Sequence, residues 1–125
     1  MRHSALAVVL LLSSSLPSPP QQKEVVVHNG FGAGQEYLDM TDSQRRAYAV
    51  GFINGILLSP ALGAPKNRVG WVERCVEGMS DVQVAAILHQ YIKSHPAEWH
   101  WGLHILSYRA LIEACPDSPS KPGKD

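Results

Sequence analysis

The two cysteines, Cys75 and Cys115, constrain the fold of this chain more than any other feature. An even number of cysteines in a small exported domain predicts a disulfide bond. A bridge closing a loop of about forty residues restricts the unfolded chain by roughly 4 kcal/mol. A reactive thiol pair is the weaker alternative, because the two cysteines lack the C-x-x-C spacing. The sequence therefore predicts a structural Cys75–Cys115 disulfide.

Residues 1–18 predict export. Arg2 and His3 precede a continuously apolar run from Ala5 to Leu12, and small residues and prolines follow. The run is far shorter than the ~20 residues needed to span a bilayer, so it indicates a cleaved signal peptide. The alternative is a buried N-terminal helix. We expect a periplasmic or secreted protein with no membrane attachment after cleavage.

The charge balance bears on the kind of partner. Eleven basic residues offset eleven acidic ones, so the formal net charge at pH 7 is zero. A neutral chain has no general attraction to phosphate backbones, and we expect no nucleic-acid partner. The length of 125 residues, with 45% hydrophobic and 18% charged residues, suits one globular domain.

Helical periodicity predicts an all-α fold, a small bundle of three main helices. Capping boxes at Thr41–Gln44 and Ser80–Gln83 mark the starts of the first two helices, which should end before Pro60 and at about Ser94. The third helix is expected to run from Pro96 to Cys115. It carries two apolar stripes, which predict a position at the centre of the core; they are Trp99, Leu103, Leu106 and Ala110, and Trp101, Ile105, Tyr108 and Ile112.

The remaining segments are expected to be irregular. Residues 19–40 form an extended lead-in, and residues 117–125 form a disordered tail to the helical domain of residues 41–116. A long loop after the first helix spans Ser59–Glu73, in which 68–75 could form a helical turn. Gly51 and Gly55, four residues apart in the first helix, predict close approach of another helix.

The long loop supplies the candidate partner-binding residues Lys66, Arg68, Trp71 and Arg74, since Trp and Arg are enriched at binding hot spots. The alternative is that Trp71 plugs the open end of the helix pair beside the disulfide, and the sequence leaves both open. His100 and His104 share a predicted helix face but lack a third ligand, so no metal or cofactor is expected. We find no G-x-S-x-G elbow or convincing carboxylate pair, and expect no enzymatic activity.

Three ordered motifs resemble the Rap/Tai family. They are Tyr48-x-x-Gly51-x-x-x-Gly55, then Val84-Ala85-Ala86-Ile87-Leu88-x-x-Tyr91-x-x-x-His95-Pro96, then Ala110-Leu111-x-x-Ala114-Cys115-Pro116, with Cys75 in the loop between the first two. The family comprises exported helical immunity proteins of type VI secretion systems that inhibit peptidoglycan-cleaving amidase effectors. The resemblance spans Tyr48 to Pro116. It departs from the family at Gln44–Ala47, where a cysteine is common, and at Cys115-Pro116, where the order is commonly Pro-Cys.

The resemblance implies a protein partner, a cell-wall amidase effector, and an immunity function in the periplasm. It assigns no residue of this chain to effector binding. A periplasmic stress chaperone, or a helical domain with another role, is the alternative. Whether the chain forms a homodimer is left open.

Overall fold

The computed structural model describes residues 15–21, 24, 26–28 and 30–119. Most of the predicted signal peptide, residues 1–14, and most of the predicted tail, residues 120–125, lie outside the described residues. The α-helices are α1 (Gly34–Asp39), α2 (Asp42–Leu58), α3 (Lys66–Val76), α4 (Asp81–Ser94) and α5 (Leu103–Ala114). Short 3-10 helices cover Ser59–Leu62 (η1) and Pro96–Glu98 (η2). The described part of the chain contains no strand, which confirms the predicted all-α class.

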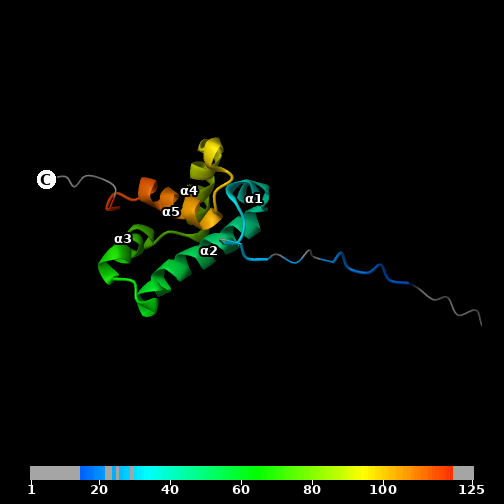
Figure 1. Ribbon diagram of the computed structural model, residues 1–125, viewed down its shortest axis with the longest axis horizontal. Coiled ribbons are helices and arrows are strands. Elements are labelled where there is room, and N and C mark those ends of the chain that lie inside the picture. Colours follow the sequence, from blue (N-terminus) through cyan, green and yellow to red (C-terminus); the bar gives the residue numbers. More distant parts are fainter. Residues whose placement is uncertain (1–14, 22–23, 25, 29, 120–125) are drawn as a thin grey trace, which may run out of the picture.

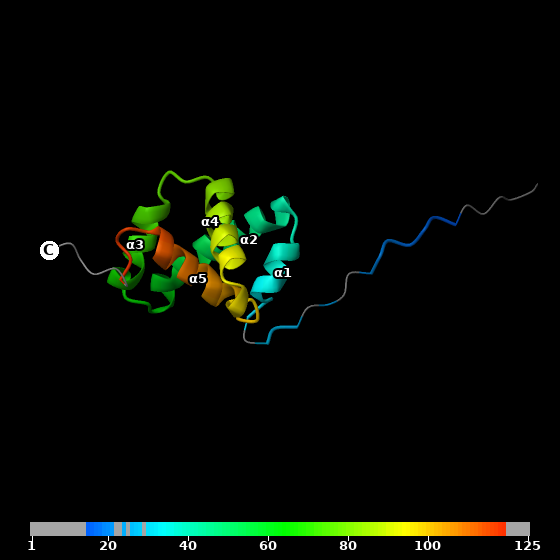
Figure 2. The same cartoon turned by 90° about the horizontal axis from the view of Figure 1, so that it is seen from above.

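Three helices form the bundle, with α4 packed against both α2 and α5. Figure 1 shows α1 and α3 at opposite ends of this bundle, and Figure 2 shows the same arrangement from above. Within the described residues, no helix is long and apolar enough to cross a membrane.

Both predicted capping boxes are present. The Gln44 amide N–H donates to Thr41 Oγ1 at 3.3 Å, and the Thr41 N–H donates to Gln44 Oε1 at 2.9 Å. Ser80 and Gln83 repeat the arrangement at 3.2 and 2.8 Å. These bonds satisfy backbone donors that a helix start leaves without partners. The starts and ends of α2 and α4 therefore match the sequence prediction to within a residue or two.

The core consists of two neighbouring clusters. The larger joins α1, α2, α4 and α5, and its fully buried members include Tyr37, Leu88, Ile92, Leu103 and Leu106. The smaller joins α3 to the C-terminal end of α5 through Trp71, Val72, Leu111 and Cys115. The predicted Cys75–Cys115 disulfide is formed, with 5.7 Å between the Cα atoms, and both cysteines pack in the smaller cluster.

The N-terminal lead-in is more ordered than expected. Residues 34–39 form α1, and its Tyr37 side chain is completely buried. The preceding backbone pairs with the turn before α5: the Gly34 N–H donates to the Trp101 carbonyl at 3.2 Å, and the Leu103 N–H donates to the Gly32 carbonyl at 3.0 Å. Contacts with residues distant in the sequence order this segment, and local periodicity does not predict such contacts.

That pairing also corrects the third predicted helix. Instead of one helix from Pro96 to Cys115, the chain forms η2, a turn at 99–102, and then α5. Gly102 takes a non-helical conformation before the first residue of α5 and forms an antiparallel bridge with Ala33. The turn at 99–102 interrupts the helix, and its backbone forms hydrogen bonds with the lead-in instead.

Three further segments differ from expectation. Most of the predicted long loop is helical, because η1 and α3 together occupy 59–62 and 66–76. Gly51 and Gly55 approach no helix: a Cβ added at either position would meet nothing within 4 Å. At the start of the predicted tail, Ser118 is buried and its hydroxyl donates to the Ile112 carbonyl at 2.7 Å.

Candidate binding surfaces

The outer side of α5 and the turn before it expose three large apolar side chains. Trp101, Ile105 and Tyr108 lie at positions i, i+4 and i+7, with 37%, 45% and 39% of their surfaces exposed. We call these three residues the aromatic stripe. They were expected to be buried, but α5 has only one buried side, formed by Leu103, Leu106, Ser107, Ala110 and Leu111. Tyr and Trp are enriched at protein–protein interfaces relative to the rest of the protein surface.

A polar network fixes the N-terminal end of the aromatic stripe. The Arg109 guanidinium lies over the Trp101 ring, 4.9 Å from its centroid, and its Nη2 lies 3.3 Å from Glu98 Oε1. The Tyr91 hydroxyl donates to Glu98 Oε2 at 3.0 Å. Burial, followed by the Glu98 contact, raises the pKa of Tyr91, so its hydroxyl stays protonated. The network holds Trp101 in place before any partner arrives, which reduces the entropy lost on binding.

The predicted partner-binding residues of the long loop divide into two groups. Trp71 is buried, with 4% of its surface exposed, and its indole N–H donates to the Arg68 carbonyl at 3.0 Å. Lys66, Arg68 and Arg74 are exposed on α3. Trp71 therefore packs beside the disulfide, as the second of the two interpretations has it. Arg74 Nε lies 4.0 Å from Asp117 Oδ2, and the role of the three cations in binding stays a prediction.

Trp71 nevertheless supports the aromatic stripe from below. Its ring lies edge-on to that of Tyr108, with 5.9 Å between centroids, so it forms a wall beneath the C-terminal end of the aromatic stripe. The smaller core cluster and the exposed stripe are thus in direct contact. This continuity is absent from the sequence pattern, because 37 positions separate the two rings along the chain.

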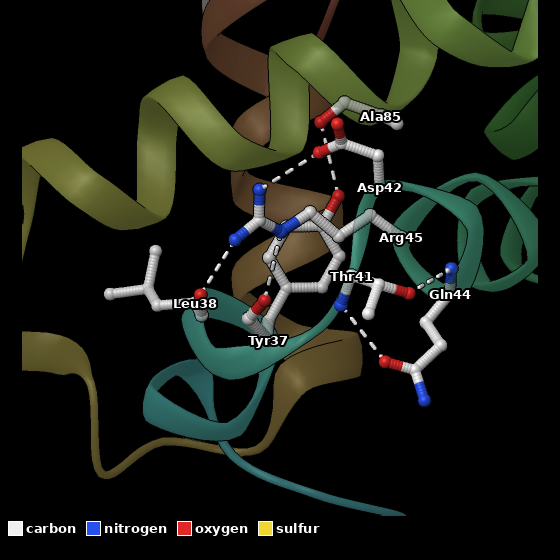
Figure 3. Close-up of polar contacts among 7 residues, drawn as sticks. All are labelled: Tyr37, Leu38, Thr41, Asp42, Gln44, Arg45 and Ala85. Carbon is white, nitrogen blue, oxygen red and sulfur yellow. Dashed lines mark hydrogen bonds and ion pairs between the residues drawn. The ribbon is translucent and has the colours of Figure 1, made fainter.

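A second polar cluster joins α1 to α2 and α4 (Figure 3). Arg45 donates from Nε to the Tyr37 carbonyl at 3.1 Å and from Nη2 to the Leu38 carbonyl at 2.6 Å. The Tyr37 hydroxyl donates to the Ala85 carbonyl at 3.0 Å, and burial raises the pKa of Tyr37 to about 12. The Tyr37 carbonyl also accepts from the Met40 N–H at 3.2 Å, so the bond from Arg45 to the Leu38 carbonyl is the one that satisfies an acceptor left over at the end of α1. The cluster has a structural role.

An open groove of about 490 Å³ lies beside Arg45, between α2 and α4. Its lining is partly apolar and partly charged: Asp42, Arg45, Arg46, Val82, Ala85, Ala86, His89 and Gln90. Arg46 Nε bonds Asp81 Oδ2 at 2.8 Å, which holds the pKa of that carboxyl below its usual range. Burial, and then the Arg45 cation, lower the pKa of His89. The charges of the groove are offset by neighbours, and the aromatic stripe is the stronger candidate for binding.

The two histidines considered as metal ligands do not share a helix. His100 lies in the turn before α5, whereas His104 lies in its first turn, with its Nδ1 buried against Gly30. Among the residues that the structure describes, no group of three or more His, Cys, Asp or Glu side chains could hold a metal ion.

Comparison with protein-family models, curated proteins and solved structures finds no match to this chain. The function is therefore inferred from the residues and surfaces described above.

Proposed function

We propose that this chain is an exported, non-enzymatic binding protein whose aromatic stripe holds a partner protein. The observation that carries the proposal is the exposure of Trp101, in the turn before α5, and of Ile105 and Tyr108 on α5, whose other side is buried in the core. Aromatic and Arg side chains dominate the energetics of protein interfaces. A structural disulfide supports export, because such bonds persist in oxidising compartments such as the periplasm.

The proposed partner is a peptidoglycan-cleaving amidase effector of type VI secretion. The resemblance to the Rap/Tai family over Tyr48 to Pro116 supports this assignment. In the proposal, the aromatic stripe covers the mouth of the amidase active site and the chain acts as an immunity protein. In the proposal, the exposed cations Lys66, Arg68 and Arg74, which lie on the same helix as Trp71, attract an acidic rim of the effector. Added salt should weaken this attraction.

The direct test uses the oxidised chain from residue 19 onward and the product of an amidase gene adjacent to its own. We expect a stable complex and loss of peptidoglycan hydrolysis. Trp101→Ala should weaken binding about 30-fold or more, the effect of removing a hot-spot side chain. Val82→Ala is the matched control, since Val82 is an exposed apolar residue on α4. Undiminished hydrolysis in the presence of excess chain would refute the immunity function.

A test in cells complements the binding measurement. Deleting the gene should make a strain sensitive to its sister cells, and wild-type chain should restore protection. A Trp101→Ala chain produced at the same level should restore less. If deletion causes no sensitivity while the effector is being delivered, the proposal fails.

A periplasmic stress chaperone is the second candidate function, favoured by the amount of exposed apolar surface on α2 and α5. Such a protein would bind unfolded clients of many sequences. It should suppress aggregation of an acid-unfolded model client, and acidification should increase its binding of a hydrophobic dye. Client protection without amidase inhibition would favour this function over immunity.

A further inference from the structure

The turn from α2 to α3 exposes large aliphatic side chains. Leu57 and Leu58, at the end of α2, have 40% and 57% of their surfaces exposed, and Leu62, in η1, has 80% exposed. We call residues 57–68 the leucine tip. Single exposed apolar residues are common on proteins, but a group of them at one site marks a contact with another molecule or with a membrane.

Hydrogen bonds hold the leucine tip in a defined shape. The Ser59 hydroxyl donates to the Ile56 carbonyl at 2.6 Å. The Gly63 N–H donates to the Pro60 carbonyl, and the Ala64 N–H donates to the Ser59 carbonyl, each at 3.1 Å. Gly63 has a φ of +99°, a left-handed conformation that favours glycine. The exposed leucines therefore project from an ordered backbone, which reduces the entropy lost on binding.

The charges near the leucine tip are all positive. From Ser43 to Val72 the sequence contains no Asp or Glu. Lys66 and Arg68, in the first turn of α3, are exposed, and among the described residues neither forms an ion pair. The next acidic residue, Glu73, lies about two helical turns beyond Lys66. The tip thus combines apolar side chains with uncompensated cations.

We infer that the leucine tip docks on a lipid bilayer with anionic headgroups. Surfaces that bind bilayers combine apolar side chains, which enter the acyl boundary, with Lys and Arg, which attract anionic headgroups. The composition favours lipid over protein, because Leu is under-represented among protein hot spots and Lys is depleted at protein interfaces. The aromatic stripe, with Trp101 and Tyr108, has the opposite composition. The two surfaces therefore serve different partners.

The contact lies at the bilayer surface and is reversible. Three leucine side chains are far fewer than the ~20 apolar residues that a membrane span needs. A single myristoyl chain gives a dissociation constant of about 0.1 mM, and we expect a value of that order or weaker for the tip. The sequence led us to expect no membrane attachment after signal cleavage. The exposure of Leu62, at a position expected in a long loop, changes that expectation.

Docking by the leucine tip leaves the start of the aromatic stripe free. Figure 1 shows α1 and α3 at opposite ends of the molecule, and the tip leads into α3. Trp101 lies at the other end, because its carbonyl accepts from the Gly34 N–H at the start of α1. A chain docked by the tip therefore keeps Trp101 away from the bilayer.

The test is co-sedimentation of the oxidised chain with lipid vesicles. The chain begins at residue 19, because an uncleaved apolar run from Ala5 to Leu12 would itself bind lipid. Vesicles of about 70% phosphatidylcholine and about 30% phosphatidylglycerol should bind the chain roughly tenfold or more tightly than pure phosphatidylcholine vesicles. Added salt should weaken the binding to the anionic vesicles.

Two pairs of variants separate the apolar and the charged contributions. Leu62→Ser should weaken binding to the anionic vesicles roughly tenfold, whereas Val82→Ser, which also removes an exposed apolar side chain, should not. Lys66→Gln should weaken it about fivefold, and Lys93→Gln, which removes an exposed Lys from α4, should have little effect. All four positions are exposed, so unchanged urea midpoints should show that the variants fold.

Hydrogen exchange locates the contact. Anionic vesicles should protect amides of 57–68 and leave those of 101–108 unchanged. Absence of binding at about 5 mM lipid overturns the inference, as does full binding by Leu62→Ser, or protection at 101–108 alone. If the wild-type chain ignores vesicles while Leu62→Ser loses amidase inhibition, the tip binds protein and the inference is wrong. The vesicle measurements contain no amidase, so their outcome is separate from that of the proposed function.

Discussion

Removing the Cys75–Cys115 bridge should destabilise the whole domain. The bridge spans a sequence separation of 40, and the loop-entropy model gives about 4 kcal/mol for a loop of that length. Small domains are stable by only about 5–15 kcal/mol in total. We therefore expect urea denaturation of Cys75→Ala/Cys115→Ala to give a free energy of unfolding about 4 kcal/mol below that of the oxidised chain.

The loss should be greatest in α3. This helix joins α5 through the bridge and the buried side chains of Trp71 and Val72. Without the bridge, α3 can open while α2, α4 and α5 stay packed. Native-state hydrogen exchange should then show α3 amides losing protection before those of α4.

The reduced wild-type chain is the matched comparison, because it differs from the oxidised chain only at the two sulfur atoms. If α3 and α4 keep equal protection after reduction, α3 does not depend on the bridge and the reasoning is wrong. A loss of stability well below 1 kcal/mol would also refute it.

Substitutions at four further positions test other contacts, each by chemical denaturation. Gly51→Ala, measured at a concentration where the chain is monomeric, should stabilise the chain by about 1 kcal/mol through helix propensity. Gly34→Ala should destabilise the chain, because the added Cβ would lie 2.6 Å from a Leu106 methyl. Equal effects of the two substitutions would contradict the close packing of α1 against Leu106. Burial raises the pKa of Tyr37 from 10 to about 12, so the stability that the protonated hydroxyl contributes is complete below pH 10 and is lost as the pH rises to 12. Tyr37→Phe should therefore remove up to about 3 kcal/mol of the alkaline pH dependence of the unfolding free energy. An unchanged alkaline profile in this variant would contradict the prediction. Arg45→Ala should cost about 1–3 kcal/mol, chiefly by removing the donor to the Leu38 carbonyl, because the Tyr37 carbonyl keeps the Met40 N–H. Arg45→Lys should recover part of this loss, and equal losses in the two variants would argue against the bond to Leu38.

The elements that could be predicted are those whose signals are local. The capping residues Thr41 and Ser80 lie within three positions of their partners, so α2 and α4 were predicted with accurate starts. The disulfide followed from the number of cysteines. These features depend on neighbours in the sequence, which a single chain displays directly.

The elements that were missed depend on distant partners. The break before α5 requires hydrogen bonds between residues 32–35 and 99–103, and α1 is a helix of six residues held by its buried Tyr37. The helical spacing of Trp101, Ile105 and Tyr108 correctly indicates an apolar stripe. It does not show whether a fourth main helix covers that stripe. The candidate site was therefore placed on α3 rather than on α5.

The turn that begins the aromatic stripe is held by main-chain atoms. The Trp101 carbonyl accepts from the Gly34 N–H, and the Trp101 N–H donates to the Glu98 carbonyl at 2.8 Å. Neither bond involves the indole ring, so another side chain at this position keeps both. Over evolutionary time such a surface can change its specificity while the scaffold persists. A lineage facing a succession of different partners could therefore alter position 101 repeatedly without losing the fold.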